Sequence, residues 1–517
     1  MVVEVKPQRQ EEYSDSGVRK LLGRYAHAKA IKDMWLPTFE ECYEYALPQR
    51  ESFYPESIGR RRSDRIFDET AVVGVQEFAS RLQSGIVPTF ARWADFQAGV
   101  EIPEEQKSQV NLQLDKITEY VFEVLQNSNF NQECHEAFMD LAVGTGCMLV
   151  EEGDAVNPIK FTAVPLPKIC LLNGPDGKID TVYRTRKVKP EHIQILYPKA
   201  VMPQYFDPLR QKKDLTIIEA VYRVYENNVE KYKYCVVLEN PKAVIFEEIY
   251  SGEGSNPYLV FRWNKASGEV YGRGPIFNAM GAIKTCNLTI ELILQNAQMA
   301  VSGVYTYEDD GVINPDNIAL VPGSLIPVAP GSRGLSSIQS ASNFDVAQLV
   351  LNDMRQNIKK ALYMETLGRP EGTPMTATEV SERMADLSRQ IGSSFGRLQS
   401  EFIHPLLKRI IRILSKQGRI ELPKVNGREV KIAARSPLAK AQHMQDIADV
   451  NRFNEIIAGT FGPQMVNVII NQNETAKYLA NKMNLPEKLI RDEEEQRQIV
   501  QQISQLQNQP KEGEIPQ

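Results

Sequence analysis

The chain has 517 residues, 42% of them hydrophobic and 24% charged, as expected for a water-soluble globular protein with roughly two to four subdomains. A formal net charge of −6 argues against a protein that binds nucleic acid over its whole surface. No apolar run is long enough to span a membrane. The start of the chain shows no signal peptide and the six cysteines form no Cys-x-x-Cys pair, so we expect reduced, buried thiols in a cytosolic compartment and no zinc site.

The first part of the chain follows a helical period. Apolar residues recur at helical spacing over residues 16–35, 67–84 and 104–141. Pro37 has no amide hydrogen to donate, so we expect it to break the first helix and to start a second one that ends before Pro48. These patterns predict a helical beginning to the fold.

The densest basic cluster stands just before the helix predicted at 67–84. It contains Arg60, Arg61, Arg62 and Arg65, and Asp68 follows closely. Because carboxylates stand beside these cations, we expect ion pairs within or between subunits in preference to a phosphate site.

Between residues 158 and 270 the apolar period changes to two, which predicts β-strands. The sequence Gly174-Pro175-Asp176-Gly177 is typical of a tight turn between two of them. A short helix is expected at 191–196. The expected strands are 161–172, 179–187, 215–225, 232–239 and 258–263. This region is therefore predicted to be a β-rich insert in a helical protein.

Two helices of similar length flank a segment of different composition. The first covers residues 275–300 and starts at Pro275, a residue favoured at the first helical position, and the second covers 345–363. The residues between them, 301–343, are rich in Gly, Pro and Ser and contain short β-like runs. The two helices can therefore run antiparallel and hold this segment at one end.

A loop with two prolines and two glycines, residues 366–375, leads into the longest helical pattern of the chain, 376–415. This pattern begins with Thr376-Ala377-Thr378-Glu379, in which the first and last side chains satisfy free backbone amides at a helix start. Apolar residues then recur about every 3.67 residues, close to the period of a straight helix. Pro405 is expected to kink this helix near Phe402.

The C-terminal part is again helical. Helices are expected over 436–457 and 474–482, and an acidic, Gln-rich amphipathic helix is expected over 492–506. The apolar stripe of that last helix is sparse, so we expect it to pack on a neighbour. Residues 507–517 have the composition of a disordered tail.

No enzyme motif stands out along the chain. The five histidines share no metal-binding spacing, and there is no His-Glu-x-x-His or Walker sequence. The abundant carboxylates leave a metal-dependent nucleic-acid hydrolase as an alternative. We otherwise expect no catalytic residue, no metal and no cofactor.

Three local phrases accompany this order of parts: Leu47-Pro48-Gln49-Arg50, Asp68-Glu69-Thr70-Ala71 and Thr376-Ala377-Thr378-Glu379-Val380. A helical start, a β-rich insert, paired helices, a loop and a long helix together resemble the portal proteins of tailed bacteriophages. The similarity is to the head-to-tail connector family of short-tailed, T7-like phages. It covers essentially the whole chain, and its motifs are architectural rather than catalytic.

The resemblance implies an α+β, mainly α portal fold with a wing, stem, clip and crown. The wing would comprise residues 1–271, with the β-rich insert at about 158–270, and the long kinked spine helix 376–415. The other parts would be stem helices 275–300 and 345–363, clip 301–343, tunnel loop 366–375, connector 416–435, crown 436–506 and a disordered tail 507–517.

The resemblance also implies a non-enzymatic function in the virion. Members of the family form a ring of about twelve subunits at one capsid vertex. A separate terminase ATPase pumps double-stranded DNA through that ring without sequence specificity, and tail or adaptor proteins later take its place. Major capsid and scaffolding proteins are further expected partners, with assembly in the host cytoplasm and no membrane. The alternative within the virion is another ring-forming tail or adaptor protein.

Three groups of site residues follow from the resemblance. The channel loop that faces DNA would contain Thr366, Leu367, Gly368, Arg369, Pro370, Glu371, Gly372 and Thr373. The second stem helix offers the cations Arg355, Lys359 and Lys360, for which ion pairing between subunits is the alternative role. The clip combines aromatic and acidic groups that suit partner docking, although a solvated turn would also explain the acidic ones. These clip residues are Tyr305, Tyr307, Glu308, Asp309 and Asp310.

Overall fold

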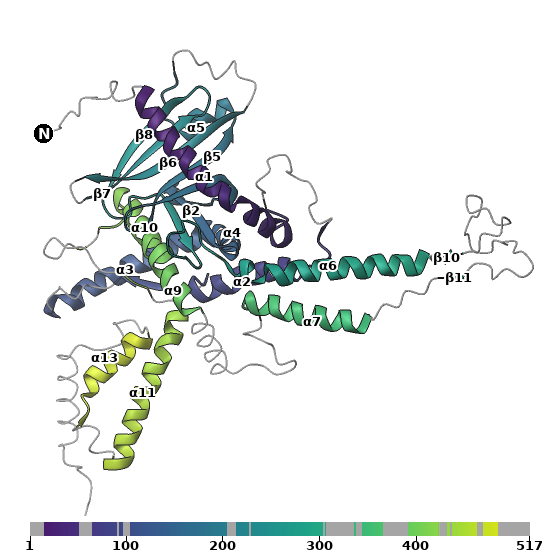
Figure 1. Cartoon of the computed structure of the whole chain (residues 1–517). Helices are drawn as coiled ribbons and strands as arrows, with labels where there is room; N and C mark the ends of the chain where they lie inside the picture. The colour runs from purple at the N-terminus through teal and green to yellow at the C-terminus, as the bar shows by residue number, and fades with distance from the viewer. Residues whose placement is uncertain are drawn as a thin grey trace, which may run out of the picture. The chain divides into compact units, whose positions relative to one another are not determined.

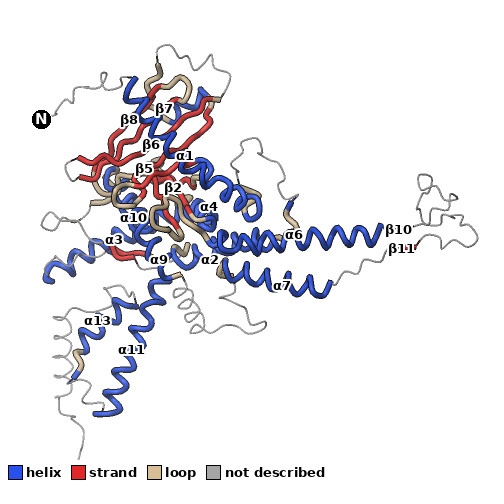
Figure 2. Tube along the Cα trace, viewed as in Figure 1, coloured by secondary structure: helices blue, strands red, loops and turns tan. Residues whose placement is uncertain are grey.

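Helices predominate in the computed structural model of the chain, and its strands gather into two main sheets (Figure 1, Figure 2). The structure describes residues 15–50, 65–89, 92–96, 104–203, 214–226, 229–302, 305–306, 336–337, 344–364, 391–421, 423, 432–434, 437–462 and 469–483. The chain divides into two compact units. One consists of Met1–Trp35, Phe78–Gly274 and Thr366–Gln517, and the other of Leu36–Glu77 and Pro275–Glu365. The predicted mainly helical α+β class is confirmed.

The larger sheet of the first unit has five antiparallel strands in the order β4-β5-β6-β7-β8. The predicted tight turn at 174–177 joins its first two strands, with Gly177 at φ +69°. The strands are β4 (Ile169–Asn173), β5 (Ile179–Val188), β6 (Leu215–Glu226), β7 (Val229–Leu238) and β8 (Ala243–Ser251). β8, an edge strand, is missing from the sequence prediction, because the consecutive acidic residues Glu247 and Glu248 break its apolar alternation. The single strand predicted at 161–172 is two strands instead: Ile159–Ala163 belongs to the smaller sheet and Ile169–Asn173 to this one.

The N-terminal part of α1 (Asp15–Ala46) packs on this sheet. Apolar side chains of the helix and of the strands form one buried cluster. The cluster includes Val18, Leu21, Ala28, Tyr183 and Cys235. The amphipathic pattern predicted at 16–35 therefore serves to bury one face of α1 on the sheet.

The predicted break of α1 at Pro37 is wrong, because the helix continues through that residue to Ala46. An internal proline costs about 3 kcal/mol through its missing hydrogen bond and its clash with the preceding turn. The residues that follow it, Phe39, Cys42 and Tyr43, are fully buried. Each such burial contributes about 1.5–3 kcal/mol, so packing outweighs the proline.

The smaller sheet of the first unit has three antiparallel strands in the order β3-β2-β9. The strands are β2 (Thr145–Glu152), β3 (Ile159–Ala163) and β9 (Tyr258–Arg262). Side chains cap both outer edges. The amide of Phe161 donates to Asn129 Oδ1 (3.1 Å), and the amide of Arg262 donates to Glu401 Oε2 (2.9 Å). These acceptors satisfy edge groups that would otherwise pair with another strand.

A buried carboxylate connects the two sheets. Glu219 of β6 is 1% exposed and accepts hydrogen bonds from the hydroxyls of Tyr258 in β9 and Tyr197. Its charge is paired with Arg186 (3.1 Å) and Arg184 (3.6 Å). A buried charge is tolerated only with such a full set of partners, so this contact fixes how the sheets meet.

The described part of the predicted long helix is continuous but not uniform. It consists of α9 (Gly392–Leu398), a π-helical turn (Gln399–Ile403) and α10 (His404–Lys416). In the π-helical turn the amide of His404 donates to the carbonyl of Gln399, five residues back, directly before Pro405. The irregularity lies where the kink is predicted, and the wider turn accommodates the proline. Residues 376–390 lie outside the described part of the chain.

The remaining helices lie where the sequence predicts helices, but they begin and end at different residues. The pattern predicted over 104–141 is two helices, α3 (Glu104–Asn127) and α4 (Phe130–Val143). Near the C-terminus, α11 (Pro437–Phe461) and α13 (Gln472–Met483) lie where helices are predicted. The sequence did not indicate that β1 (Ala94–Phe96) pairs with β12 (Ile432–Ala434), which lies in the predicted connector.

The aromatic cluster under the π-helical turn provides a test of the spine. Phe402 is fully buried, with its ring centroid 4.5 Å from that of Phe261 and 5.6 Å from that of Phe138. Phe402→Ala should lower the free energy of unfolding by about 3–5 kcal/mol, because it leaves a cavity among these rings. Urea unfolding measures the change. Val156→Ala, at an 87% exposed position, is the control and should stay within about 0.5 kcal/mol of the parent. Equal small effects would show that the spine does not pack here.

Candidate functional site

Two long helices dominate the second unit, α6 (Pro275–Ser302) and α7 (Phe344–Ala361). Figure 1 shows them side by side and antiparallel, with the short strands β10 (Tyr305–Thr306) and β11 (Ser336–Ser337) beyond their far ends. The structure thus has the helical hairpin that the sequence indicates, with Pro275 at the first helical position.

The inner part of this hairpin is covered. On α6 the residues Ile276, Ile283 and Cys286 are buried, and on α7 the buried residues are Leu351 and Ile358. These positions follow helical spacing, so each helix presents one apolar stripe to its surroundings in the unit. The second part of α1 adds a contact between the rings of Phe39 and Phe277 and an ion pair between Lys284 and Glu41 (2.6 Å).

A buried amide joins α6 to the segment that precedes α2 (Thr70–Ile86). Asn287 is 7% exposed, and its Oδ1 accepts hydrogen bonds from the amides of Phe67 (2.7 Å) and Asp68 (3.3 Å). Its Nδ2 donates to the carbonyl of Arg65 (2.8 Å). One side chain therefore satisfies three backbone groups of the segment 65–68.

Asp68 joins the same segment to α7. Its Oδ1 accepts a hydrogen bond from the amide of Thr70 (2.9 Å), and its Oδ2 accepts one from Nε of Arg355 (2.8 Å). Burial alone would raise the pKa of this carboxyl, but the hydrogen bonds from Thr70 and Arg355 outweigh burial and hold its pKa below the ordinary value. We call Asn287, Asp68 and Arg355 the polar clasp, because it binds both helices to the start of α2.

The sequence contained a signal for the clasp. Asn287 occupies an apolar position in the helical stripe of 275–300, and a polar residue there needs partners when the stripe is buried. The ion pair expected near the basic cluster also exists, but it joins Asp68 to Arg355 rather than to the cluster itself. Of that cluster only Arg65 is described, and it pairs with Glu44 (3.2 Å).

The predicted site residues divide into described and undescribed groups. Arg355 is part of the polar clasp, whereas Lys359 is half-buried and Lys360 is exposed farther along α7. Tyr305 lies in β10. The predicted channel loop, residues 366–373, and the other clip residues, Tyr307 and 308–310, lie outside the described part of the chain.

The outer part of the hairpin exposes large apolar side chains. On α6 the exposed fractions are 56% for Leu288, 50% for Leu292 and 51% for Leu294. On α7 they are 71% for Leu349 and 38% for Val350. Leu288 and Leu292 are four residues apart and therefore share one face of α6. Exposed apolar side chains that gather on one face are typical of protein–protein contact surfaces.

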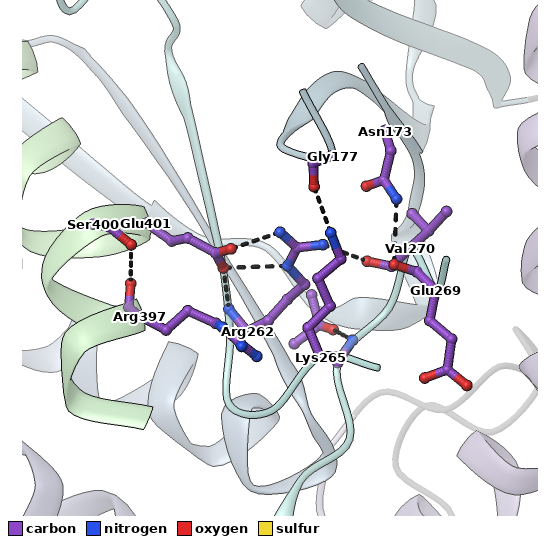
Figure 3. Close-up of polar contacts among 11 residues, drawn as sticks. Asn173, Gly177, Arg262, Lys265, Glu269, Val270, Arg397, Ser400 and Glu401 are labelled. Atoms are coloured by element: carbon purple, nitrogen blue, oxygen red, sulfur yellow. Dashed lines mark hydrogen bonds and ion pairs between the residues drawn. The ribbon is translucent and has the colours of Figure 1, made fainter. Parts of the chain in front are cut away.

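Ionic contacts tie the spine to β9 in the first unit (Figure 3). Arg262 is 2% exposed and donates to Glu401 through its backbone amide, Nε and Nη2. Glu401 belongs to the π-helical turn, so the irregular turn places the carboxylate at the edge of the sheet. Lys265, three residues after the end of β9, donates to the carbonyl of Gly177 (2.7 Å).

A second buried arginine reinforces this attachment. Arg409 of α10 donates to the carbonyls of Val150 (3.1 Å), Gly254 (3.3 Å) and Ser255 (3.3 Å). Burial lowers the pKa of its guanidinium to about 10, which leaves it charged at neutral pH. The spine is therefore fixed to the smaller sheet at two successive points.

The described residues contain no metal-binding cluster, and two of their buried thiols are unreactive. Among them, no group of three or more His, Cys, Asp or Glu side chains is placed to hold a metal ion. Burial raises the pKa of Cys42 to about 12 and that of Cys286 to about 11, so neither thiol is a nucleophile at neutral pH. Within the same residues, no helix is both long enough and apolar enough to cross a bilayer.

Known proteins are similar to nearly the whole chain. The family model described as "Bacteriophage head to tail connecting protein" matches residues 18–490. A probable portal protein of Bordetella phage BPP-1 is 22% identical, over 84% of this chain and 81% of its own length. Portal proteins of Salmonella phage epsilon15 and Escherichia phage T7 are 22% and 20% identical, covering 82% and 74% of this chain and 79% and 72% of their own. None of these descriptions names a catalytic activity.

A weaker similarity exists among solved structures. A chain of the virion of a native gene transfer agent particle aligns with 84% of this chain and 95% of its own, at 11% identity. The TM-score is 0.36, which is too low to support an argument about the placement of parts.

The polar clasp makes stability depend on pH. Asp68→Asn should lower the free energy of unfolding at neutral pH by about 1–3 kcal/mol, because it weakens charge-assisted bonds to Arg355 and Thr70. The folded pKa of Asp68 lies below its unfolded value of about 3.9, so this stabilisation is present above that pH and is lost as pH falls through the folded pKa. The deficit of the variant should therefore shrink in acid.

Urea unfolding at about pH 7 and about pH 3 checks this. Asp154→Asn, at an exposed position, is the matched control and should differ little from the parent at either pH. A deficit for Asp68→Asn that is the same at both pH values would mean that its charge is not the cause.

Proposed function

The chain belongs to the family of bacteriophage head to tail connecting proteins and functions as a portal, and on this premise we propose that it assembles into a closed ring of about twelve subunits. The ring would occupy one vertex of the capsid and conduct double-stranded DNA during packaging and ejection. It would act without catalysis of its own, so a separate terminase would supply the work of pumping.

The exposed apolar surface of the α6–α7 hairpin carries this proposal. The inner half of the hairpin is held by the polar clasp, whereas Leu288, Leu292 and Leu349 of the outer half are at least 50% exposed. Burying a leucine contributes about 1.5–3 kcal/mol, so a neighbouring copy that covers these side chains would be bound firmly. Repeating one such heterologous contact with a fixed rotation closes a ring.

The charge of the subunit suits a channel for DNA. Duplex DNA carries about one negative charge per 1.7 Å, so a uniformly basic bore would bind it tightly and stall it. A net charge of −6 per subunit makes the ring anionic, so the DNA phosphates would find few places to bind in the channel. Lys359 and Lys360 would make only transient phosphate contacts, whereas Arg355 is engaged with Asp68. Contacts of this kind to phosphates carry no sequence specificity.

The parts of the chain are assigned on the same premise. The wing would comprise residues 1–271 and 376–415, which include the two sheets and the spine, and the hairpin α6–α7 would form the stem. Residues 301–343 would form the clip that docks terminase and then tail or adaptor proteins. Residues 366–375 would be the tunnel loop and 416–435 a connector, and the crown would cover 436–506. Capsid and scaffolding proteins would contact the ring as it assembles in the host cytoplasm.

Placing a charge on the exposed stem surface tests the proposal. Leu292→Glu and Leu349→Glu should each abolish rings, because assembly would bury an unpaired carboxylate. The isolated subunits should keep the circular dichroism and melting temperature of the parent, since both side chains are exposed in the subunit. Size-exclusion chromatography with light scattering measures the assembly.

Gln298→Glu is the matched control, because it adds the same charge at an exposed polar position of α6. It should assemble as the parent does. Rings in normal yield from both leucine variants would contradict the stem assignment.

A further inference from the structure

Four charged side chains gather where the spine contacts β9, and their charges do not balance (Figure 3). Three of them are cations, Arg262, Lys265 and Arg397, and the fourth is the carboxylate of Glu401. Three positive charges against one negative charge leave an excess of two positive charges in this group.

Arg262 already occupies the carboxylate of Glu401. Oε1 of Glu401 accepts from Nη2 of Arg262, and Oε2 accepts from Nε (3.2 Å) and from the backbone amide (2.9 Å) of the same residue. Lys265 donates to the carbonyl of Gly177 instead. The two remaining cations therefore have no share in the one carboxylate of the group.

Arg397 has a donor that is not satisfied. Its Nη1 is buried and makes no hydrogen bond in the described part of the chain. The position of α9, which carries Arg397, is fixed nearby, because Ser394 Oγ donates to Oδ1 of Asn264 (3.1 Å). Figure 3 shows the side chain of Arg397 extending from α9 toward β9. A buried donor without an acceptor destabilises the fold, most of all when it is charged, and a bound ion is one of the few explanations for it.

The cations of the group also affect one another. Partial burial lowers the pKa of Lys265, and the charges of Arg262 and Arg397 lower it further. Glu401 acts in the opposite direction and does not cancel the effect. A further anion beside Lys265 and Arg397 would relieve this repulsion.

We propose that Arg397 and Lys265 form a binding site for one oxyanion, a phosphate or a carboxylate, beside the pair of Arg262 and Glu401. The planar guanidinium of Arg397 binds two oxygens of the anion, and the ammonium of Lys265 acts as a point charge. The anion supplies the acceptor that Nη1 lacks and offsets the excess positive charge. Asn264, directly before Lys265, is exposed, so the anion reaches the site from solvent.

Such an oxyanion has two possible sources. One is dissolved phosphate, and in that case the assembled ring binds it as well as the separate subunit does. The other is a carboxylate of a neighbouring subunit in the proposed ring, since each subunit has 66 acidic residues against 60 Lys and Arg residues. In that case phosphate binds only to separate subunits, and ring formation needs Arg397. This second source rests on the proposed function, whereas the site itself does not.

Calorimetric titration with inorganic phosphate measures the site, on the full chain as separate subunits and as rings, in chloride buffer at constant ionic strength. Arg397→Met should weaken phosphate binding to the subunit about tenfold or more, because a charge-assisted hydrogen bond is lost. The variant should melt no lower than the parent in phosphate-free buffer, since it removes a buried charge that has no partner there. If Arg397→Met does not fold, Lys265→Met tests the same site and should also bind phosphate more weakly.

Arg412→Met is the matched control. It removes the same charge from the same spine, at a residue that donates to the carbonyl of Glu253. It should bind phosphate and form rings as the parent does.

Weaker phosphate binding by Arg397→Met, with rings in normal yield, would support the site and assign it to dissolved phosphate. Several-fold fewer rings from Arg397→Met but not from Arg412→Met, with no phosphate bound by parent rings, would support it and assign it to a carboxylate of the neighbour. Equal ring yields, with phosphate binding that is equal in parent and Arg397→Met or absent from both, would overturn the inference and leave the portal function standing. A parent chain that never forms rings would refute the proposed function, and phosphate binding to its subunits would still decide the site.

Discussion

The buried amide of Asn287 is the contact on which the paired helices depend. It lies in an otherwise apolar stripe of α6 and binds three backbone groups of a segment more than 200 residues earlier in the chain. Burying these backbone groups without hydrogen-bond partners would destabilise the fold, so the contact holds the segment 65–68 against α6. Arg355 of α7 holds Asp68 of that same segment. Both helices thus share one anchor near the middle of the hairpin, and the exposed leucines of α6 follow it directly along the helix.

The first unit is built on a related principle, in which buried charges are satisfied by fixed partners. Glu219 joins the two sheets, Glu401 joins the spine to β9, and Arg409 joins it to three carbonyls. Removing one partner of such a contact leaves an uncompensated charge, so the relative positions of sheet and spine are strongly specified. The π-helical turn belongs to this arrangement, because it brings Glu401 to the sheet edge directly before Pro405.

The sequence predicted what depends on local period and turn chemistry. The helices α6 and α7, the tight turn at 174–177 and the irregularity before Pro405 all follow from spacing and residue type. The continuation of α1 through Pro37 was not predictable, because it depends on burial of side chains by distant segments. The pairing of β1 with β12 joins residues more than 330 positions apart, and no local pattern encodes it.

The candidate site shows the same division. The cations of α7 could be named from the helical pattern, but the pairing of Arg355 with Asp68 could not, since both residues look like ordinary surface charges in the sequence. Asn287 carried a visible signal as a polar residue in an apolar stripe, without any indication of its partners.

The most direct test of this account is the symmetry and mass of the purified protein, from electron-microscope class averages combined with light scattering. The account predicts a closed ring of about twelve subunits with a central bore. Its wall at the stem would be the α6–α7 hairpins, with their leucines covered by neighbouring copies. A stable monomer or dimer at all salt concentrations, with scaffolding protein supplied, would contradict it.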